Sequence, residues 1–105
     1  MIFTAWTNGT KGFGFKISEK DRNIYFSRDV TSIKIQLPNN NSITTVTCNT
    51  NKKSFWNSTC RELINSEIEK WLKENNFFPW EKGNPPKFEV KQISLDTYKI
   101  LKKVE

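Results

Sequence analysis

The sequence predicts an α+β fold that is mainly β: a small barrel of about seven short strands with one amphipathic helix. Three observations lead to this prediction. The chain has 105 residues, enough for one domain with a modest core, so we expect a single domain over residues 1–105. Apolar and polar residues alternate through most of the chain, at the period of a strand. Only one segment carries apolar residues at helical spacing.

The first half of the chain is predicted to form five short strands in a meander. The first covers Ile2–Thr7, and Asn8-Gly9 after it is the strongest two-residue hairpin signal. The other strands are predicted at Lys11–Ile17, Asn23–Ser27, Ser32–Leu37 and Ile43–Cys48. Their alternating aromatic and β-branched residues are typical of strands with one buried face.

The helix is predicted from about Cys60 to Asn75. Thr59 and Glu62 have the spacing of a capping box, in which hydroxyl and carboxylate satisfy each other's backbone amides. An apolar stripe follows at helical spacing: Cys60, Leu63, Ile64, Ile68, Trp71 and Leu72. We expect this helix to pack on the sheet and cover one open end of the barrel. Asn75-Asn76 suits a left-handed cap, and Lys87–Ile93 and Thr97–Lys102 are the last two strands.

Composition argues for a binding protein. The chain has 17 Lys and Arg against 11 Asp and Glu, a net charge of +6, which favours polyanionic partners. It has no His, so the commonest general base and metal ligand are missing, and we expect no catalytic residue, metal or cofactor. Cys48 and Cys60 cannot complete a four-ligand zinc site. We expect both to be reduced, with a disulfide as the alternative.

Two enzyme interpretations rank below binding. Glu89-Val90-Lys91 matches the E-x-K element of one metal-dependent nuclease superfamily, but the partner Asp is missing upstream at the expected spacing. A small basic ribonuclease would stabilise transition-state charge with Lys and Arg. The N-terminal residues lack the pattern of a secretory signal, and no apolar run is long enough to span a membrane, so we expect a cytoplasmic protein with no membrane partner.

One motif carries aromatic residues beside a positive charge. Residues 11–15 read KGFGF, Trp6 precedes them, and Tyr25-Phe26-Ser27 follows. This pattern resembles the first ribonucleoprotein motif of the cold-shock domain over about the first 27 residues. The resemblance implies that Phe13, Phe15 and Tyr25 stack single-stranded bases. The other interpretation is that Phe13, Phe15 and Phe26 are inward-facing core residues of the barrel, since alternating aromatics in a strand usually mark a core face.

A second resemblance covers more of the chain. Four predicted elements follow one another: a strand ending in a basic residue (Ile24 to Arg28), a strand pair (Ile33 to Cys48), a helix (Cys60 to Asn75) and a strand reading K-F-E-V (from Lys87). This order is similar to the DNA-binding pseudobarrel of plant transcription factors and of restriction-endonuclease recognition domains. The resemblance implies that two arms, Asn8 to Arg22 and Asn49 to Ser54, grip duplex DNA. The arms would contribute Lys11, Lys16, Lys20 and Arg22, then Lys52 and Lys53.

The distribution of charge agrees with this interpretation. Residues 1–60 carry eight basic and three acidic side chains, whereas residues 61–80 carry three basic and four acidic ones. Lys outnumbers Arg 14 to 3, which suits phosphate contacts more than bidentate reading of guanine. The leading prediction is therefore a non-catalytic module that binds duplex DNA, and single-stranded DNA or RNA binding is the second. A protein-interaction or inhibitor module that uses the patch from Phe77 to Pro86 is the third. The candidate nucleic-acid-binding residues are Lys11, Phe13, Phe15, Lys16, Lys20, Arg22, Tyr25, Arg28, Lys52 and Lys53.

Overall fold

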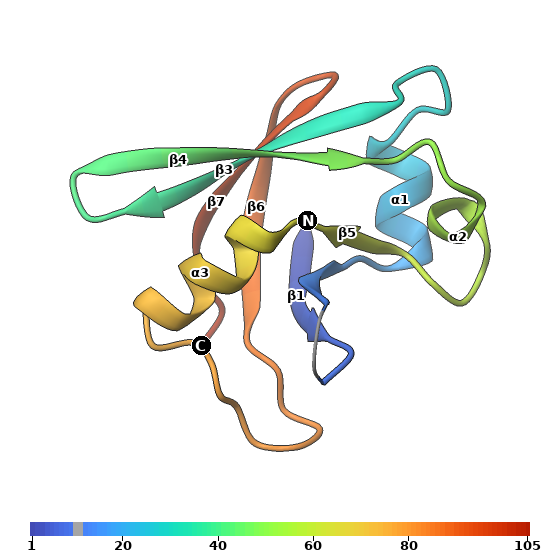
Figure 1. Cartoon of the computed structure of the whole chain (residues 1–105). Coiled ribbons are helices and arrows are strands. Elements are labelled where there is room, and N and C mark those ends of the chain that lie inside the picture. The colour runs from blue at the N-terminus through green and yellow to red at the C-terminus, as the bar shows by residue number, and fades with distance from the viewer. Residues whose placement is uncertain (10–11) are drawn as a thin grey trace.

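Within residues 1–9 and 12–105, which the computed structural model describes, seven strands form one sheet that curls into a nearly closed barrel (Figure 1). The strands are β1 (Ile2–Thr7), β2 (Phe13–Lys16), β3 (Ser32–Asn39), β4 (Ser42–Asn49), β5 (Glu62–Ile64), β6 (Lys87–Ser94) and β7 (Thr97–Lys103). Their order across the sheet is β4-β3-β7-β6-β1-β2-β5. The predicted mainly β barrel is confirmed.

The meander predicted for the first half of the chain is wrong in its connections. Strands β1 and β2 form one antiparallel hairpin, and β3 and β4 form another. The chain leaves β2, crosses one end of the barrel and enters β3, which lies between β4 and β7 and pairs with β7 in parallel. Alternation in the sequence identified these strands but carried no information about which of them are neighbours.

The strand predicted at Asn23–Ser27 is also wrong, because helix α1 (Glu19–Tyr25) occupies most of that segment. The Ser18 hydroxyl accepts a hydrogen bond from the backbone N–H of Asp21 at 3.0 Å, which caps the first turn of the helix. Glu19 and Asp21 in that turn interact favourably with the positive end of the helix dipole. Phe26, the C-cap of the helix, has extended backbone.

The long helix predicted from Cys60 begins six residues later than expected. Residues Glu62–Ile64 form β5, which pairs with β2, and helix α3 covers Ser66–Glu74. Its cap is the Asn65 side chain, which accepts from the backbone N–H of Glu67 at 2.8 Å. The capping box at Thr59 is therefore not formed. The left-handed end was predicted correctly, since Asn76 has φ 61°.

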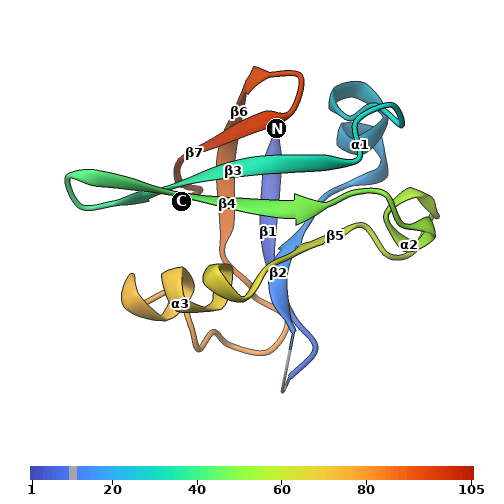
Figure 2. The same ribbon diagram turned by 45° about the horizontal axis from the view of Figure 1, so that its top comes forward.

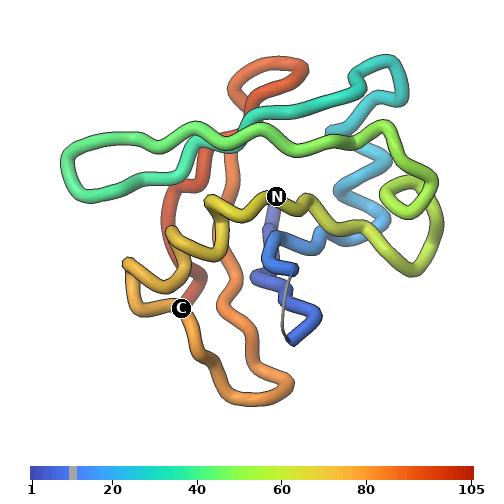
Figure 3. Tube along the Cα trace, in the orientation of Figure 1, coloured from blue at the N-terminus to red at the C-terminus, as the bar shows by residue number. Residues whose placement is uncertain are grey.

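A short helix, α2 (Lys53–Trp56), was not predicted. It lies beside α1 at one end of the barrel, whereas α3 lies at the other, as Figure 2 and the chain trace in Figure 3 show. Phe26 and Phe55 bury their rings beneath α1 and α2 at a centroid distance of 5.3 Å. Trp71 packs from α3 against Phe88 at 5.3 Å. The expectation that the helix covers one end of the barrel is confirmed for α3.

The two edge strands of the sheet meet through a side chain. Asn65 Nδ2, just after β5, donates to the carbonyl oxygen of Thr47 in β4 at 2.7 Å. Strands β2 and β5 approach so closely that a Cβ at Gly14 would overlap the Leu63 carbonyl oxygen, so the position requires glycine. Across the described residues, none of the helices is long and apolar enough to cross a membrane.

Candidate nucleic-acid interface

The predicted site residues divide into three groups in the structure. Lys11 lies outside the described residues. Phe13 and Phe15 point into the barrel, and Lys16 lies on the outer face of β2 opposite Glu62 of β5. The others lie on or beside α1 and α2: Lys20, Arg22, Tyr25, Arg28, Lys52 and Lys53.

The aromatic stacking face predicted from Phe13 and Phe15 is not formed. Phe13 is 5% exposed and Phe15 is fully buried. The Phe15 ring packs against Phe3 and Phe88 at centroid distances of 5.6 and 5.8 Å. The Phe13 ring meets Phe78 edge-on at 5.0 Å. Both rings belong to the core, because strand alternation turns them inward together, and neither can receive a base while the barrel is folded.

Tyr25 helps to hold α1 in place. Its side chain is half-buried against the core, and its carbonyl oxygen accepts hydrogen bonds from Tyr98 Oη at 2.9 Å and Gln92 Nε2 at 3.0 Å. Burial raises the pKa of the Tyr98 hydroxyl to about 12, so that hydroxyl stays protonated at neutral pH and continues to donate. The C-terminal end of α1 is thereby fixed to the last two strands.

Arg22 is the predicted contact residue whose placement differs most from expectation. It is 5% exposed, and its Nη1 donates to the carbonyl oxygens of Phe55 at 3.1 Å and Asn57 at 2.6 Å. Glu19 lies 3.8 Å from its Nη2. The guanidinium is thus used to join α1 to the segment around α2. It is a structural group and not a free contact for a phosphate.

Arg61 has a similar role on the other side of the same segment. Its Nε donates to the Ile17 carbonyl oxygen at 2.9 Å, and its Nη1 donates to the Ser58 carbonyl oxygen. Two of the three arginines therefore hold the backbone between residues 55 and 61 against β2 and α1. The segment that follows the second predicted arm is thereby fixed to the barrel.

Trp56 forms the centre of a cationic cluster. Its indole Nε1 donates to the Thr50 carbonyl oxygen at 2.9 Å, which fixes the ring. The guanidinium carbons of Arg28 and Arg22 lie 4.6 and 5.4 Å from the ring centroid, within the range of a cation–π interaction. A Trp three residues after a Lys-Lys pair was the available sequence signal, but the arginines that meet it are about thirty residues away in the chain.

Four cationic side chains remain at this end of the barrel, and we call them the basic end: Lys20, Arg28, Lys52 and Lys53. Lys20 comes from the first predicted arm, Lys52 and Lys53 come from the second, and Arg28 follows α1; the adjacency of α1 and α2 brings these segments to the same end of the molecule (Figures 1 and 2). Among the described residues, none of the four has a carboxylate within 4.0 Å. Their charge is therefore available to a ligand.

The acidic residues nearest in sequence are partly engaged in the fold. Asp21 Oδ2 accepts from the backbone N–H of Ile2 at 3.2 Å, and Glu19 faces Arg22. Asp29 is exposed beside Arg28. The basic end thus keeps a positive surplus, although a smaller one than the count of its lysines and arginines alone suggests.

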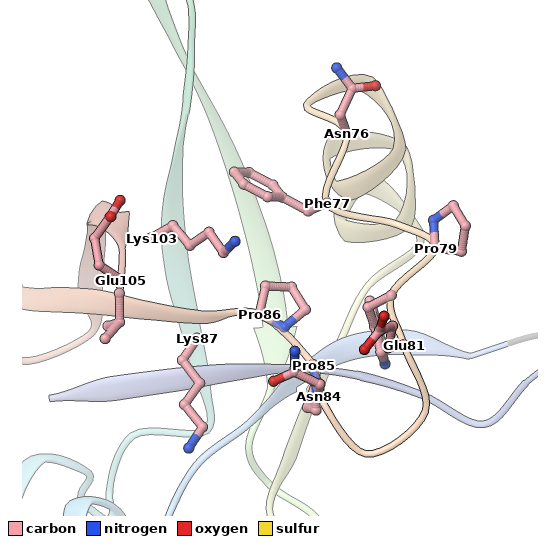
Figure 4. A pocket seen from close by; sticks show the side chains of 12 residues that line it. Asn76, Phe77, Pro79, Glu81, Asn84, Pro85, Pro86, Lys87, Lys103 and Glu105 are labelled. Carbon is pink, nitrogen blue, oxygen red and sulfur yellow. The ribbon is translucent and has the colours of Figure 1, made fainter.

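The patch from Phe77 to Pro86 closes the opposite end of the barrel. Phe77 packs on Trp71 and Phe88 at 5.3 and 5.0 Å, and Phe78 packs on Trp80 at 5.3 Å. A cavity of about 590 Å³ lies outside these rings. Figure 4 shows Lys103 extending toward Phe77 across this cavity, with Pro86 among the residues that line it. These aromatics are mainly an extension of the core.

The cysteines are both free, as expected. Cys48 is buried, and its burial raises the pKa of the thiol to about 12. Cys60 is only half-buried. Neither is within a group of potential metal ligands in the described part of the chain.

No protein-family model, no curated protein and no solved structure matches the chain. The function must therefore be argued from the site itself.

Proposed function

We propose that this protein is a non-catalytic nucleic-acid-binding module that binds the backbone of duplex DNA through its basic end. The observation that carries the proposal is the joining of α1 to the segment around α2 by Arg22, which donates to the carbonyl oxygens of Phe55 and Asn57. The segments that carry Lys20 and Arg28 and those that carry Lys52 and Lys53 thereby lie together at one end of the barrel.

The residue types favour phosphate contacts. Three of the four groups of the basic end are lysines, which bind phosphate as point charges with three donors each. Arg22 and Arg61, which could have read guanine edges, donate to backbone carbonyls instead. Binding through such contacts depends little on base sequence, because phosphates carry no direct sequence information.

A duplex is favoured over a single strand by the position of the aromatic rings. Sequence-independent binding of single strands relies on exposed rings on which bases stack. Phe13 and Phe15 are buried, and the Trp56 ring is covered by Arg28 at 4.6 Å. A surface of cations without an open aromatic platform is suited to the regularly spaced phosphates of a duplex.

The proposal is tested by fluorescence anisotropy with a labelled mixed-sequence duplex, the corresponding single strand and an RNA duplex. We expect the DNA duplex to bind with a Kd in the range of about 1 to 100 μM at about 50 mM salt, as for non-specific binding. Tighter binding of the single strand would favour the second predicted function instead. No binding of any nucleic acid up to about 100 μM would overturn the proposal.

A protein-interaction function at the Phe77–Pro86 patch is the second candidate, favoured by the cavity of about 590 Å³ beside Phe77 and by Lys103 at its wall. This arrangement would suit a peptide with an aliphatic group for the cavity and a carboxylate for Lys103. If it operates, Trp80→Ala abolishes capture of such a peptide and leaves affinity for DNA unchanged. A Trp80→Ala variant that weakens DNA binding and leaves peptide capture unchanged would contradict this candidate.

A further inference from the structure

Two lysines face each other on the outer surface of the sheet, away from the basic end. Lys91 of β6 and Lys99 of β7 are directly opposite in the antiparallel register. Their strand neighbours Val90, Tyr98 and Ile100 are buried, so strand alternation turns both lysines outward. Directly opposite residues have Cβ atoms about 5 Å apart, which brings the two ammonium groups within reach of one small anion.

This pairing is unfavourable unless something compensates for it. Like charges directly opposite on a sheet are destabilising. Two other lysines of the sheet have acidic partners: Lys34 of β3 lies 3.9 Å from Asp96, and Lys102 of β7 lies 4.0 Å from Glu89. Neither Lys91 nor Lys99 has a carboxylate within 4.0 Å in the described part of the chain. The two acidic residues that could serve them are thus engaged elsewhere.

The same row continues across the sheet with hydrogen-bond donors. Gln36 of β3 lies opposite Lys99 in the parallel register, and Thr45 of β4 lies opposite Gln36. The row therefore consists of a hydroxyl, an amide and two ammonium groups on four neighbouring strands, with no carboxylate in it. Such a set of groups suits an oxyanion that accepts several hydrogen bonds.

The residues next to the two lysines in the sequence are hydrogen-bonded to α1. Gln92, next to Lys91, and Tyr98, next to Lys99, both donate to the carbonyl oxygen of Tyr25 at the end of α1. The outer face of these strand segments carries the lysines, and the inner face holds the helix that leads to the basic end. The strands that carry the lysine pair therefore also hold the helix that carries Lys20.

We propose that Lys91 and Lys99 form a phosphate-binding pair that makes a second contact with the nucleic-acid backbone. The identity of the polyanion rests on the proposed function, whereas the phosphate site itself rests on the sheet register and the missing acidic partners. Sequence reasoning did not find this site, because the opposition of the two lysines depends on a register that includes irregularities at Glu89/Val90 and at Gln92/Ser94.

The test uses the full chain with Lys91→Gln and Lys99→Gln combined. The matched control combines Lys70→Gln and Lys82→Gln, which removes the same charge from exposed positions on α3 and on the loop after it. For duplex DNA, we expect the slope of log K against log salt to become less steep by about 2 in the Lys91/Lys99 variant, at about 0.9 per phosphate contact, and to change little in the control. An equal slope in the two variants would overturn the site.

Thermal unfolding separates binding from a structural role. Removing two opposed like charges should leave the Tm unchanged or raise it. A Tm that falls well below that of the control, together with a lost salt slope, would assign the lysines to the fold and overturn the proposal.

A polyphosphate experiment tests the phosphate site separately from DNA binding. If the wild type binds no DNA, the proposed function is overturned, but the phosphate site is still tested. Sodium hexametaphosphate should then raise the Tm of the wild type and of a Lys52→Gln, Lys53→Gln variant, but not that of the Lys91/Lys99 variant. Equal shifts in all three proteins would overturn the phosphate pair.

Discussion

The guanidinium of Arg22 donates a 2.6 Å hydrogen bond to the carbonyl oxygen of Asn57, and this single side chain joins helix α1 to the segment that follows α2. The same Nη1 also donates to the Phe55 carbonyl oxygen. A residue that the sequence marks as a contact for DNA is thus the group that holds the proposed contact surface together.

Replacing Arg22 should therefore lower the free energy of unfolding by more than the loss of an exposed charge would. Arg22→Ala leaves two carbonyl oxygens without their donor in a largely buried place, and we expect a loss of about 3 kcal/mol in the free energy of unfolding. Arg28→Ala removes an exposed guanidinium and a cation–π contact, and should cost about 1 kcal/mol or less. Denaturant unfolding of the two variants measures the difference, and equal losses would show that Arg22 does not join the two segments.

Asn65 should have two separable roles. Its Oδ1 caps α3, and its Nδ2 donates to Thr47 across the two edges of the sheet. Asn65→Ser keeps a good cap and removes the amide donor, so we expect a loss of about 1 kcal/mol. Asn65→Ala removes both and should lose about 2 kcal/mol. If the serine variant is as stable as the wild type, the bond to Thr47 does not help to close the barrel.

Phe15 should behave as a core residue and not as a base-stacking one. Its ring packs among Phe3, Phe88 and Trp71. Phe15→Ala is expected to destabilise the protein by about 3 to 5 kcal/mol. Ile93→Ala, at a position that is 49% exposed, serves as the control and should have little effect. A folded Phe15→Ala protein of normal stability that has lost single-strand binding would restore the aromatic-face interpretation.

Stability should fall at alkaline pH because of Cys48. Burial raises the pKa of its thiol from the ordinary 9.0 to about 12 in the folded protein, whereas the unfolded chain ionises at the ordinary value. Between these values the unfolded state has lost a proton that the folded state keeps, so the stability present below pH 9 decreases as the pH rises. Unfolding of the wild type and of Cys48→Ala between about pH 8 and pH 10 measures this, and the variant should show the weaker pH dependence. Parallel curves for the two proteins would contradict it.

The fold was predictable where the signal is local. Alternation located the strands Ile2–Thr7 and Ser32–Leu37 closely, because side-chain period and turn residues lie within a few residues of each other. Residues 23–27 were assigned to a strand because Ile24, Tyr25 and Phe26 favour strands by type. The segment forms a helix instead, which is stabilised by the Ser18 cap and by the long-range hydrogen bonds of Arg22 and Tyr25.

The segment Glu62–Ile64 was assigned to the helix for a related reason. Leu63 fits the apolar stripe that continues through Ile68, yet Leu63 pairs with Phe15 across the sheet. A buried residue at helical spacing looks the same in sequence whether it belongs to a helix or to a three-residue strand before it. Only the Asn65 cap marks the true start of α3.

The candidate site was predictable in part. Lys20, Arg28, Lys52 and Lys53 were identified by charge in turn-rich segments, and the segments that carry them lie at one end of the barrel; their contact with DNA stays a prediction. The burial of Arg22 was not predictable, because its acceptors are backbone carbonyls more than thirty residues away. Side chains on two strands, such as Lys91 and Lys99, can be paired only once the register is known.

The salt dependence of duplex binding tests the central claim most directly. The basic end is altered by Lys52→Gln and Lys53→Gln together, with Lys70→Gln and Lys82→Gln as the control of equal charge, between about 50 and 200 mM salt. The account predicts that the slope of log K against log salt becomes less steep by about 2 in the first variant and stays near that of the wild type in the control. Slopes that are equal in the two variants would contradict it.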